Sequence, residues 1–226
     1  MPSTQYNLII AAHPDDETIF FSSIILKGDA KTRVLCVTDG NADGQGQKRY
    51  AQFEDACRQL GVDDFQFLGF PDIYDRRLNY EELAKSFSNE TNLKAVYTHG
   101  PTGEYMHPHH QDLSYAVHRF FQGQCDIYVP AYNCFASKVM ELSQDEYQLK
   151  AKILSEVYGS ETRRFLNLIP CTQVETFVAL DFSEVDEIYQ VLTGRKVKLD
   201  RSLLKAYRWL AEYLEIKAQE DGKRLF

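Results

Sequence analysis

"YNLIIAAHPDDETIF", residues Tyr6–Phe20, places four charged or polar residues directly after an apolar run. The run predicts a buried strand. Charged groups are costly to bury unless they are paired or bind a metal ion. His13, Asp15, Asp16 and Glu17 at the end of this strand therefore indicate a functional site.

Strand-like and helix-like segments alternate through the first half of the chain. Strands are expected at residues 6–12, 32–40, 65–70, 93–100 and 126–132, and helices at 17–27, 48–61, 79–87 and 110–121. This alternation predicts an α/β fold with a mostly parallel sheet that has helices on both faces. Gly61 is expected to end the second helix as its C′ residue.

The second half of the chain is less regular. A helix is expected at 143–161 and a strand at 176–182, while the basic cluster at 195–201 is interpreted as a solvated face rather than a phosphate site. A final stripe is formed by Leu203, Tyr207, Leu210 and Leu214. We expect it to pack on the same domain; a contact in a homo-oligomer is the alternative. A single domain is expected over 1–226, with a strand–helix core at 1–135 and the C-terminal part at 136–226 packed on it.

Composition excludes several classes of protein. The chain has 226 residues and a formal net charge of -8, which argues against a nucleic-acid binder because such proteins usually carry a basic face. Its five cysteines are scattered and contain no C-x-x-C, so neither a disulfide framework nor a cysteine zinc site is expected. We expect a cytoplasmic protein with no signal peptide and no integral membrane segment, while peripheral membrane contact stays open.

Unusual polar residues follow four of the expected strands. His13 to Glu17 follow the first strand, Asp39 the second, Asp72 the third and His99 the fourth. Ligands of open α/β sheets bind at the carboxyl ends of the strands. We therefore expect these residues to share one edge of the sheet.

His13 and Asp16 are three residues apart, so their side chains can converge on one side of a first helical turn. An imidazole and a carboxylate at that spacing can begin a divalent metal site. Asp15 would point differently and stay unligated. Taken alone, the motif fits helix capping equally well.

A histidine cluster favours the metal site. Four of the six histidines fall within "HGPTGEYMHPHH", residues 99–110. A catalytic zinc ion needs three protein ligands and one open position for water, and this segment offers the third ligand.

Together, "AHPDDE" and "GEYMHPHH" resemble the paired motifs of the PIG-L/LmbE-like family of metal-dependent N-deacetylases. The resemblance extends through "TDG" (38–40), "KRYAQFEDACRQLG" (48–61), "GFPD" (69–72) and "LKAKILSEVYGSE" (149–161), so it covers most of residues 6–160. It implies a Rossmann-like fold and a hydrolase of linear amide C–N bonds. The implied substrate is an N-acetylated amino sugar or its conjugate.

The resemblance also implies roles for single residues. His13, Asp16 and His110 match the zinc ligands, and Asp15 matches the general base. The remaining matches are His107 as the group that stabilises the oxyanion, Tyr105 as a mobile tyrosine near the substrate carbonyl, and Arg49 and Asp72 as contacts to the sugar or its substituent. Fe²⁺ could replace zinc, because two histidines and one aspartate do not discriminate sharply between divalent ions.

Two positions depart from the family pattern. Met106 stands where Gly is frequent, which implies a stiffer loop. His109 stands where Asp is frequent, which leaves open whether His109 or His110 coordinates the metal.

The chemistry is coherent without the resemblance. Zinc lowers the pKa of bound water to ~7. A carboxylate such as Asp15 can take the proton of this water, and an imidazolium such as that of His107 can stabilise the oxyanion that develops.

Other motifs are incomplete. The loop at 39–50 lacks the Glu of an EF-hand, "GQGQKR" (44–49) lacks a nucleotide-binding pattern, and no G-x-S-x-G elbow occurs. A carbohydrate-binding or regulatory protein that kept this pocket and lost catalysis remains the alternative to an enzyme.

Overall fold

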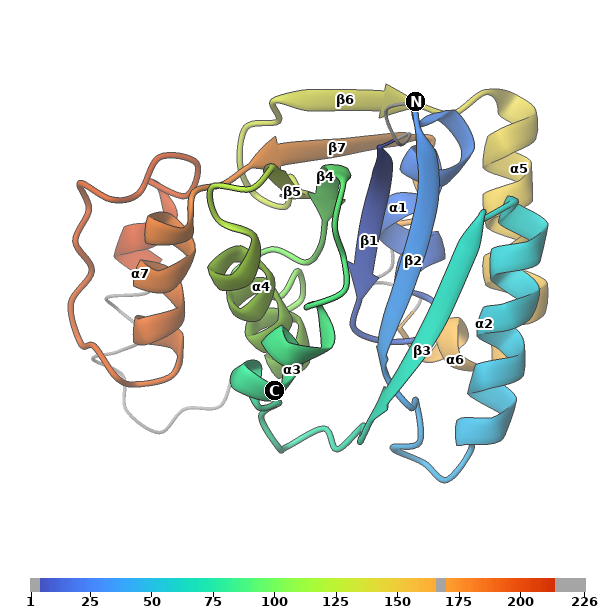
Figure 1. Cartoon of the computed structure of the whole chain (residues 1–226), viewed down its shortest axis with the longest axis horizontal. Helices are drawn as coiled ribbons and strands as arrows, with labels where there is room; N and C mark the ends of the chain where they lie inside the picture. The colour runs from blue at the N-terminus through green and yellow to red at the C-terminus, as the bar shows by residue number, and fades with distance from the viewer. Residues whose placement is uncertain (1–4, 166–169, 214–226) are drawn as a thin grey trace.

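The structure is a computed structural model, and it describes residues 5–165 and 170–213. Within these ranges, seven strands form one sheet in the order β3-β2-β1-β4-β5-β7-β6 (Figure 1). Five of them are parallel: β1 (Tyr6–Ala11), β2 (Lys31–Thr38), β3 (Asp64–Phe70), β4 (Leu93–Tyr97) and β5 (Asp126–Pro130). Two are antiparallel to their neighbours: β7 (Val174–Ala179) and β6 (Lys138–Glu141). The α/β fold with a mostly parallel sheet is confirmed.

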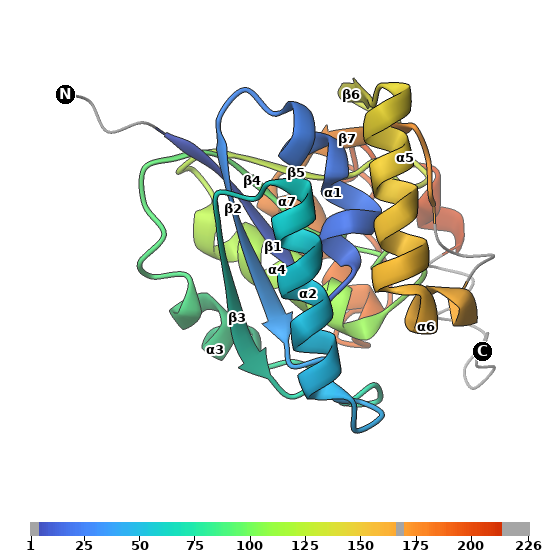
Figure 2. The ribbon, with the colours of Figure 1, turned by 90° about the vertical axis from the view of Figure 1, so that its right-hand side faces the viewer.

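Helices cover both faces of this sheet. One face carries α1 (Asp16–Lys27), α2 (Gly46–Leu60) and α5 (Gln144–Lys152), which Figure 2 shows side by side. The other face carries α3 (Tyr80–Ser86), α4 (Pro108–Phe121) and α7 (Phe182–Leu192). Short helical segments also occur: the π-helical turn η1 (Ile153–Val157), α6 (Gly159–Thr162) and the 3₁₀ turn η2 (Arg163–Phe165).

The central strand β1 is mostly apolar because both of its faces are covered. Ile9 packs with Phe20 and Phe53 under α1 and α2, whereas Leu8 and Ile10 pack under α3 and α4. Burying each such side chain contributes about 1.5–3 kcal/mol relative to leaving it in water. The apolar run at the start of the chain therefore fixes the middle of the sheet.

Some elements differ from the sequence prediction. The helix expected at 143–161 is divided into α5, the π-turn η1 and α6. The strand β6 and the helix α7 were not predicted. As expected, Gly61 ends α2 in the left-handed conformation, with φ 74°.

The prediction for the C-terminal stripe was only partly correct. Tyr207 is buried in a cluster with residues of α7, and Leu210 packs against that cluster, so both pack on the same chain. In place of Leu203, the neighbouring Leu204 is the fully buried residue. Leu214 lies outside the described residues.

No helix in the described part of the chain combines the length and the apolar character that crossing a membrane requires.

The sheet has a topological switch point between β1 and β4. The chain leaves β1 toward α1 on one face and leaves β4 toward α4 on the opposite face. In open α/β sheets, ligands bind in the crevice at the carboxyl ends of the strands at such a point. His13 follows β1 and His99 follows β4, so the residues singled out from the sequence lie there.

Candidate active site

A reverse turn after β1 brings the first two candidate ligands together. The backbone N–H of Asp16 donates to the carbonyl of His13 (3.2 Å), and Oδ2 of Asp16 accepts from the backbone N–H of His13 (2.8 Å). His13 therefore precedes α1, and this reverse turn brings its side chain to that of Asp16. Asp15, the N-cap residue, has φ 121°, a strained conformation that costs on the order of 1–3 kcal/mol and is typical of functional sites.

Three donor atoms meet at the bottom of the site. Nδ1 of His13 and Nε2 of His110 lie 3.3 and 3.4 Å from Oδ2 of Asp16, and they are 3.1 Å from each other. Ligands at ~2.0–2.1 Å in a tetrahedron would be roughly 3.3–3.4 Å apart, so this triangle has the dimensions of a zinc face. Oδ1 of Asp16 is buried and has no hydrogen-bond partner among the described residues. The residues present thus fit a divalent metal ion.

The carboxylate of Glu104 faces ring nitrogens of two of the imidazoles. This residue was not identified from the sequence. Its Oε2 lies 2.7 Å from Nδ1 of His110 and 2.9 Å from Nδ1 of His99, and its Oε1 accepts the N–H of Gly100 (2.7 Å). When Nδ1 of His110 carries the ring proton and donates it to this carboxylate, Nε2 keeps a free lone pair and faces Asp16. Carboxylates behind metal-binding histidines commonly fix ring orientation in this way.

The buried carboxylates favour positive charge among these donors. Burial lowers the pKa of His110, but Asp16 and Glu104 outweigh it and raise the pKa to about 10. Burial likewise raises the pKa of Glu104, but His99 and His110 outweigh it and lower the pKa to about 2. A site that stabilises positive charge so strongly suits a cation.

His107 lies at the N-cap of α4, beside this triangle. The backbone N–H of His109 donates to Nδ1 of His107 (3.2 Å), so the ring proton of His107 sits on Nε2. Burial, followed by the charges of His13, His110 and His109, lowers the pKa of His107. This lowered pKa favours a neutral imidazole, which can donate through Nε2, over the imidazolium considered in the sequence analysis.

The histidine pair of α4 divides between two positions. His110 reaches Asp16, whereas the ring of His109 lies on the other side of His13, with Nδ1 at 3.1 Å from Nε2 of His13. His13, His107 and His109 form a second group whose donor atoms lie within 4.8 Å of one another. Among the described residues, the group of His13, Asp16 and His110 is the one that includes a carboxylate with a buried oxygen lacking a hydrogen-bond partner.

A cavity of about 330 Å³ opens above the donors, within the usual size range of small-molecule sites. Six of the eight residues singled out from the sequence line it: His13, Asp15, Arg49, Asp72, Tyr105 and His107. The other two, Asp16 and His110, are fully buried below it.

Asp15 and Arg49 form an ion pair in the cavity wall. Nη2 of Arg49 lies 3.1 Å from Oδ2 of Asp15 and also donates to the carbonyl of Pro14. Burial raises the pKa of Asp15 to about 7, against the opposing charge of Arg49. A carboxyl with a pKa near neutrality is suited to general-base chemistry.

Asp72 and Tyr105 also reach the cavity. Oδ1 of Asp72 lies 3.5 Å from Nδ1 of His109 and 3.7 Å from Nε2 of His13, beyond normal hydrogen-bond distance. Tyr105 packs edge-on against His107 and His110, and burial raises the pKa of its hydroxyl far above the ordinary value, so it stays a neutral phenol. Met106 has φ 69°, a conformation that favours glycine, the residue that the family resemblance implies at this position.

Several wall residues were not found from the sequence. Tyr74 lies at the mouth with 64% of its surface exposed and its ring 5.3 Å from that of His107. At the rim, Arg164 pairs with Asp43 (3.3 Å) and Glu161 (3.7 Å). The contacts of Tyr74 with His107 and of Arg164 with Asp43 join segments far apart in the sequence, so no local pattern could have predicted them.

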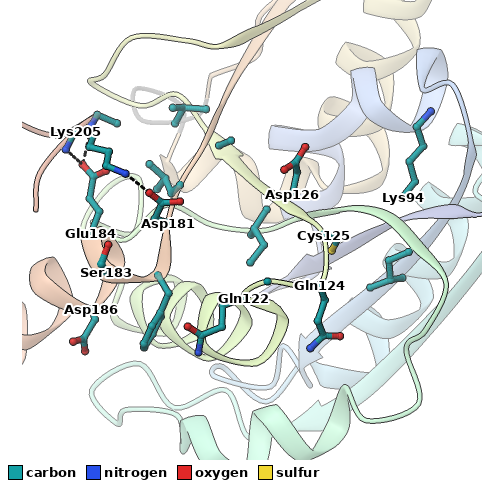
Figure 3. A pocket seen from close by; sticks show the side chains of 18 of the residues that line it. Lys94, Gln122, Gln124, Cys125, Asp126, Asp181, Ser183, Glu184, Asp186 and Lys205 are labelled. Carbon is teal, nitrogen blue, oxygen red and sulfur yellow. Dashed lines mark hydrogen bonds and ion pairs between the residues drawn. The ribbon is translucent and has the colours of Figure 1, made fainter.

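A larger hollow of about 1260 Å³ lies at the opposite edge of the sheet (Figure 3). Its labelled charges are largely satisfied within the chain: Lys205 pairs with Asp181, and Glu184 accepts the backbone N–H groups of Lys205, Ala206 and Tyr207. This hollow is not lined by His13, Asp16 or His110, so the candidate metal site belongs to the smaller cavity.

The part of the chain that carries this site is similar to known proteins. Residues 8–121 match the model of the PIG-L family, described as GlcNAc-PI de-N-acetylase. An N-acetylglucosaminyl-phosphatidylinositol de-N-acetylase from Bos taurus is 34% identical over 122 residues, covering 49% of this chain and 48% of that protein. A probable enzyme of the same name from Dictyostelium discoideum is 31% identical over 119 residues, covering 47% and 46%. The chain thus spans about half the length of the curated relatives it matches first.

Bacterial and archaeal proteins extend the similarity. A 1D-myo-inositol 2-acetamido-2-deoxy-alpha-D-glucopyranoside deacetylase from Thermobifida fusca is 25% identical over 185 residues, covering 65% of this chain and 64% of that protein. The N,N'-diacetylchitobiose deacetylase of Pyrococcus horikoshii has the same fold, with a TM-score of 0.62 and 19% identity over 80% of this chain and 85% of that one.

Proposed function

The chain belongs to the PIG-L family, and on that premise we propose that it is a metal-dependent hydrolase that removes the N-acetyl group from an N-acetylated amino sugar. Zinc is the proposed metal, with Fe²⁺ as the alternative. His13, Asp16 and His110 are the proposed ligands. The family match covers residues 8–121, which contain all of the proposed site residues.

One observation supports this proposal above the others. The donor triangle of His13, Asp16 and His110 lies directly beneath a cavity whose wall carries Asp15 and His107. Metal donors, a base and a hydrogen-bond donor therefore surround one space. Amide hydrolysis needs those three components in one place.

A divalent metal at the triangle would supply Lewis acidity toward the amide carbonyl and lower the pKa of water to ~7. Asp15 is placed to take a proton from the attacking water as the oxygen–carbon bond forms. The same proton then passes from Asp15 to the amide nitrogen as the carbon–nitrogen bond breaks. The products are acetate and the free amino sugar.

Neutral side chains assist at the carbonyl oxygen. His107 donates a hydrogen bond through Nε2 to this oxygen as negative charge develops on it. The phenol of Tyr105, which packs against His107 and His110, is a second donor near the same position. Preorganised donors of this kind are typically worth 10²–10³ in rate each, because they are aimed at charge that appears only in the transition state.

The proposed substrate class is a 2-acetamido-2-deoxyglucoside with a variable aglycone. The relatives named above act on such compounds according to their names, and the cavity size fits a small polar ligand. Arg49 and Asp72 are proposed to contact the sugar from the cavity wall. Both line the cavity beside the base and the first ligand.

The test is acetate release from a panel of N-acetylglucosaminides: the free sugar, an aryl glycoside, an inositol glycoside, a nucleotide sugar and a lipid-linked sugar. We expect release that is lost after chelation and restored by zinc or ferrous iron. A protein that binds metal but releases no acetate from any member would support the non-catalytic carbohydrate-binding alternative. A protein that binds neither metal would contradict the proposal itself.

A further inference from the structure

His109 is a fully buried histidine that the proposed mechanism does not use. Its Nε2 lies 2.9 Å from the carbonyl oxygen of Arg76 and 3.1 Å from that of Ile73, in the loop between β3 and α3. Its Nδ1 lies 3.1 Å from Nε2 of His13. The ring therefore bridges that loop and the first proposed ligand.

These contacts fix where the protons lie. Carbonyl oxygens only accept hydrogen bonds, so Nε2 of His109 must carry the ring proton. In the neutral ring, Nδ1 of His109 is then an acceptor. The 3.1 Å contact is a hydrogen bond only if Nε2 of His13 donates it.

This arrangement determines which nitrogen of His13 is free. With its proton on Nε2, the ring of His13 presents the lone pair of Nδ1. That is the atom 3.3 Å from Oδ2 of Asp16 and 3.1 Å from Nε2 of His110. The opposite tautomer would place a proton in the centre of the donor triangle.

We propose that His109 is a positioning residue that holds His13 in the Nε2–H tautomer and thereby keeps Nδ1 of His13 free to bind a divalent metal. The metal-binding half of this inference rests on the proposed function. The family pattern that the sequence resembles often has Asp at this position. Here an imidazole does the accepting, and its own N–H is anchored on two backbone carbonyls.

Asp72 is the competing partner for His13. Its Oδ1 lies 3.7 Å from Nε2 of His13, against 3.1 Å for Nδ1 of His109, and its side chain is partly exposed whereas that of His109 is not. At 3.7 Å the carboxylate is too distant for a normal hydrogen bond. The distances therefore favour His109.

The direct test needs no substitution. The full-length protein, labelled with ¹⁵N in its histidine rings and stripped of metal, is examined by NMR at about pH 8, above the ordinary histidine pKa of about 6.5. We expect His13 to show a protonated Nε2 and an unprotonated Nδ1. A proton on Nδ1 of His13 would overturn the inference. This readout does not depend on activity, so it holds or fails separately from the proposed deacetylase.

Zinc affinity, measured by competition with a chelator, tests the consequence. His109→Phe keeps a ring but removes the acceptor, and we expect it to weaken zinc binding by about 10–100-fold. His109→Asn can place its amide oxygen near the position of Nδ1 and should recover most of that loss. The matched control is His118→Phe. His118 is a buried histidine further along α4 whose hydrogen-bond partner, among the residues that the structure describes, is the carbonyl of Ser114, and the variant should bind zinc as the wild type does.

Three outcomes would contradict the proposal. Wild-type affinity in His109→Phe would show that the contact is irrelevant. Equal losses in His109→Phe and His109→Asn would show that the acceptor is not the cause. A larger loss in Asp72→Asn than in His109→Phe would assign the role to Asp72. Thermal unfolding of each variant identifies any that fail to fold, and the ring-nitrogen spectrum of the wild type then decides alone.

Discussion

The guanidinium of Arg49 lies 3.1 Å from Oδ2 of Asp15, and both side chains are largely buried, with 8% and 16% of their surfaces exposed. Arg49 also donates to the carbonyl of Pro14, so it holds the strained turn on both sides of the Pro14–Asp15 peptide. The proposed base is thus fixed in place by a residue from the first turn of α2. Two predictions depend on this pair.

Asp15→Asn is expected to lower kcat by about 10²–10⁴-fold, because an amide of nearly the same shape cannot accept the proton. Metal content should be unchanged, since the three proposed ligands are intact. Acetate release and elemental analysis measure the two effects. Asp126→Asn, at the opposite edge of the sheet, is the matched control and should retain activity. Near-normal turnover in Asp15→Asn would reject the general-base role.

Arg49→Ala is expected both to raise KM and to lower kcat. A residue that only contacts the sugar would affect mainly KM, but the ion pair with Asp15 adds an effect on the base. Arg49→Lys keeps the charge without the planar fork, so it should fall between the wild type and Arg49→Ala. Steady-state kinetics on one glycoside separates the effect on KM from the effect on kcat. A change in KM alone would remove the ion pair from the mechanism and leave Arg49 as a substrate contact.

His107→Ala and His110→Ala should fail in different ways. Nε2 of His110 faces Asp16, so its loss is expected to abolish tight metal binding. His107 hydrogen-bonds to the N–H of His109 and lines the cavity, so its loss should leave the metal bound and lower kcat by roughly 10²–10⁴-fold. Metal content and acetate release are measured on both variants. Metal loss in His107→Ala with retention in His110→Ala would reverse the two assignments.

The parallel core and most of the site could be predicted because their signals are local. Most of the parallel strands contain a short apolar run, and the motif around His13 follows the first one. The edge strand β6 could not be predicted, because its four residues alternate between exposed and half-buried and only the pairing with β7 makes them a strand. The π-turn η1 was also missed. It precedes Tyr158, whose hydroxyl donates to Glu17 (2.8 Å) across the chain.

Contacts that only the folded chain brings together could not be predicted from the sequence either. Nothing in "GPTGEYMHP" marks Glu104 as buried, since an acidic residue in a glycine- and proline-containing loop is usually solvated. Its burial depends on His99 at the end of β4 and His110 in α4 meeting the same carboxylate. The pairing of Asp15 with Arg49 likewise depends on how α2 packs.

Zinc should stabilise the metal-free protein. A ligand at 100 times its Kd adds about 2.7 kcal/mol to the free energy of unfolding, which corresponds to a rise in Tm of roughly 5–11 °C for a chain of this size. The reason is that the triangle exists only in the folded chain, so zinc binds the folded state and not the unfolded one. Zinc there would also bring positive charge beside Asp16, whose buried Oδ1 has no hydrogen-bond partner among the described residues. Thermal unfolding with and without zinc measures this, with Asp16→Ala as the control that should not respond. An equal shift in both proteins would place the zinc elsewhere.

Glu104→Gln tests whether the carboxylate behind the histidines sets the metal affinity. One oxygen of Glu104 faces ring nitrogens of both His99 and His110, and the other accepts the N–H of Gly100. A glutamine has only one oxygen, so its NH₂ group must point at an N–H donor on one side or the other. With the NH₂ group toward His110, the tautomer that leaves Nε2 of His110 free for the metal is disturbed. With the NH₂ group toward Gly100, it opposes the backbone N–H that helps to hold residue 104 in place.

We therefore expect Glu104→Gln to weaken zinc binding by about 10–100-fold, measured by chelator competition, while the fold is retained. Glu161→Gln is the matched control, because Glu161 is also buried and lines the cavity but pairs with Lys48 and Arg164 at the rim, away from the donors. It should bind zinc as the wild type does. If Glu104→Gln binds zinc with wild-type affinity at a wild-type Tm, the orientation of His110 comes from the packing of α4 instead, and the carboxylate has no part in it.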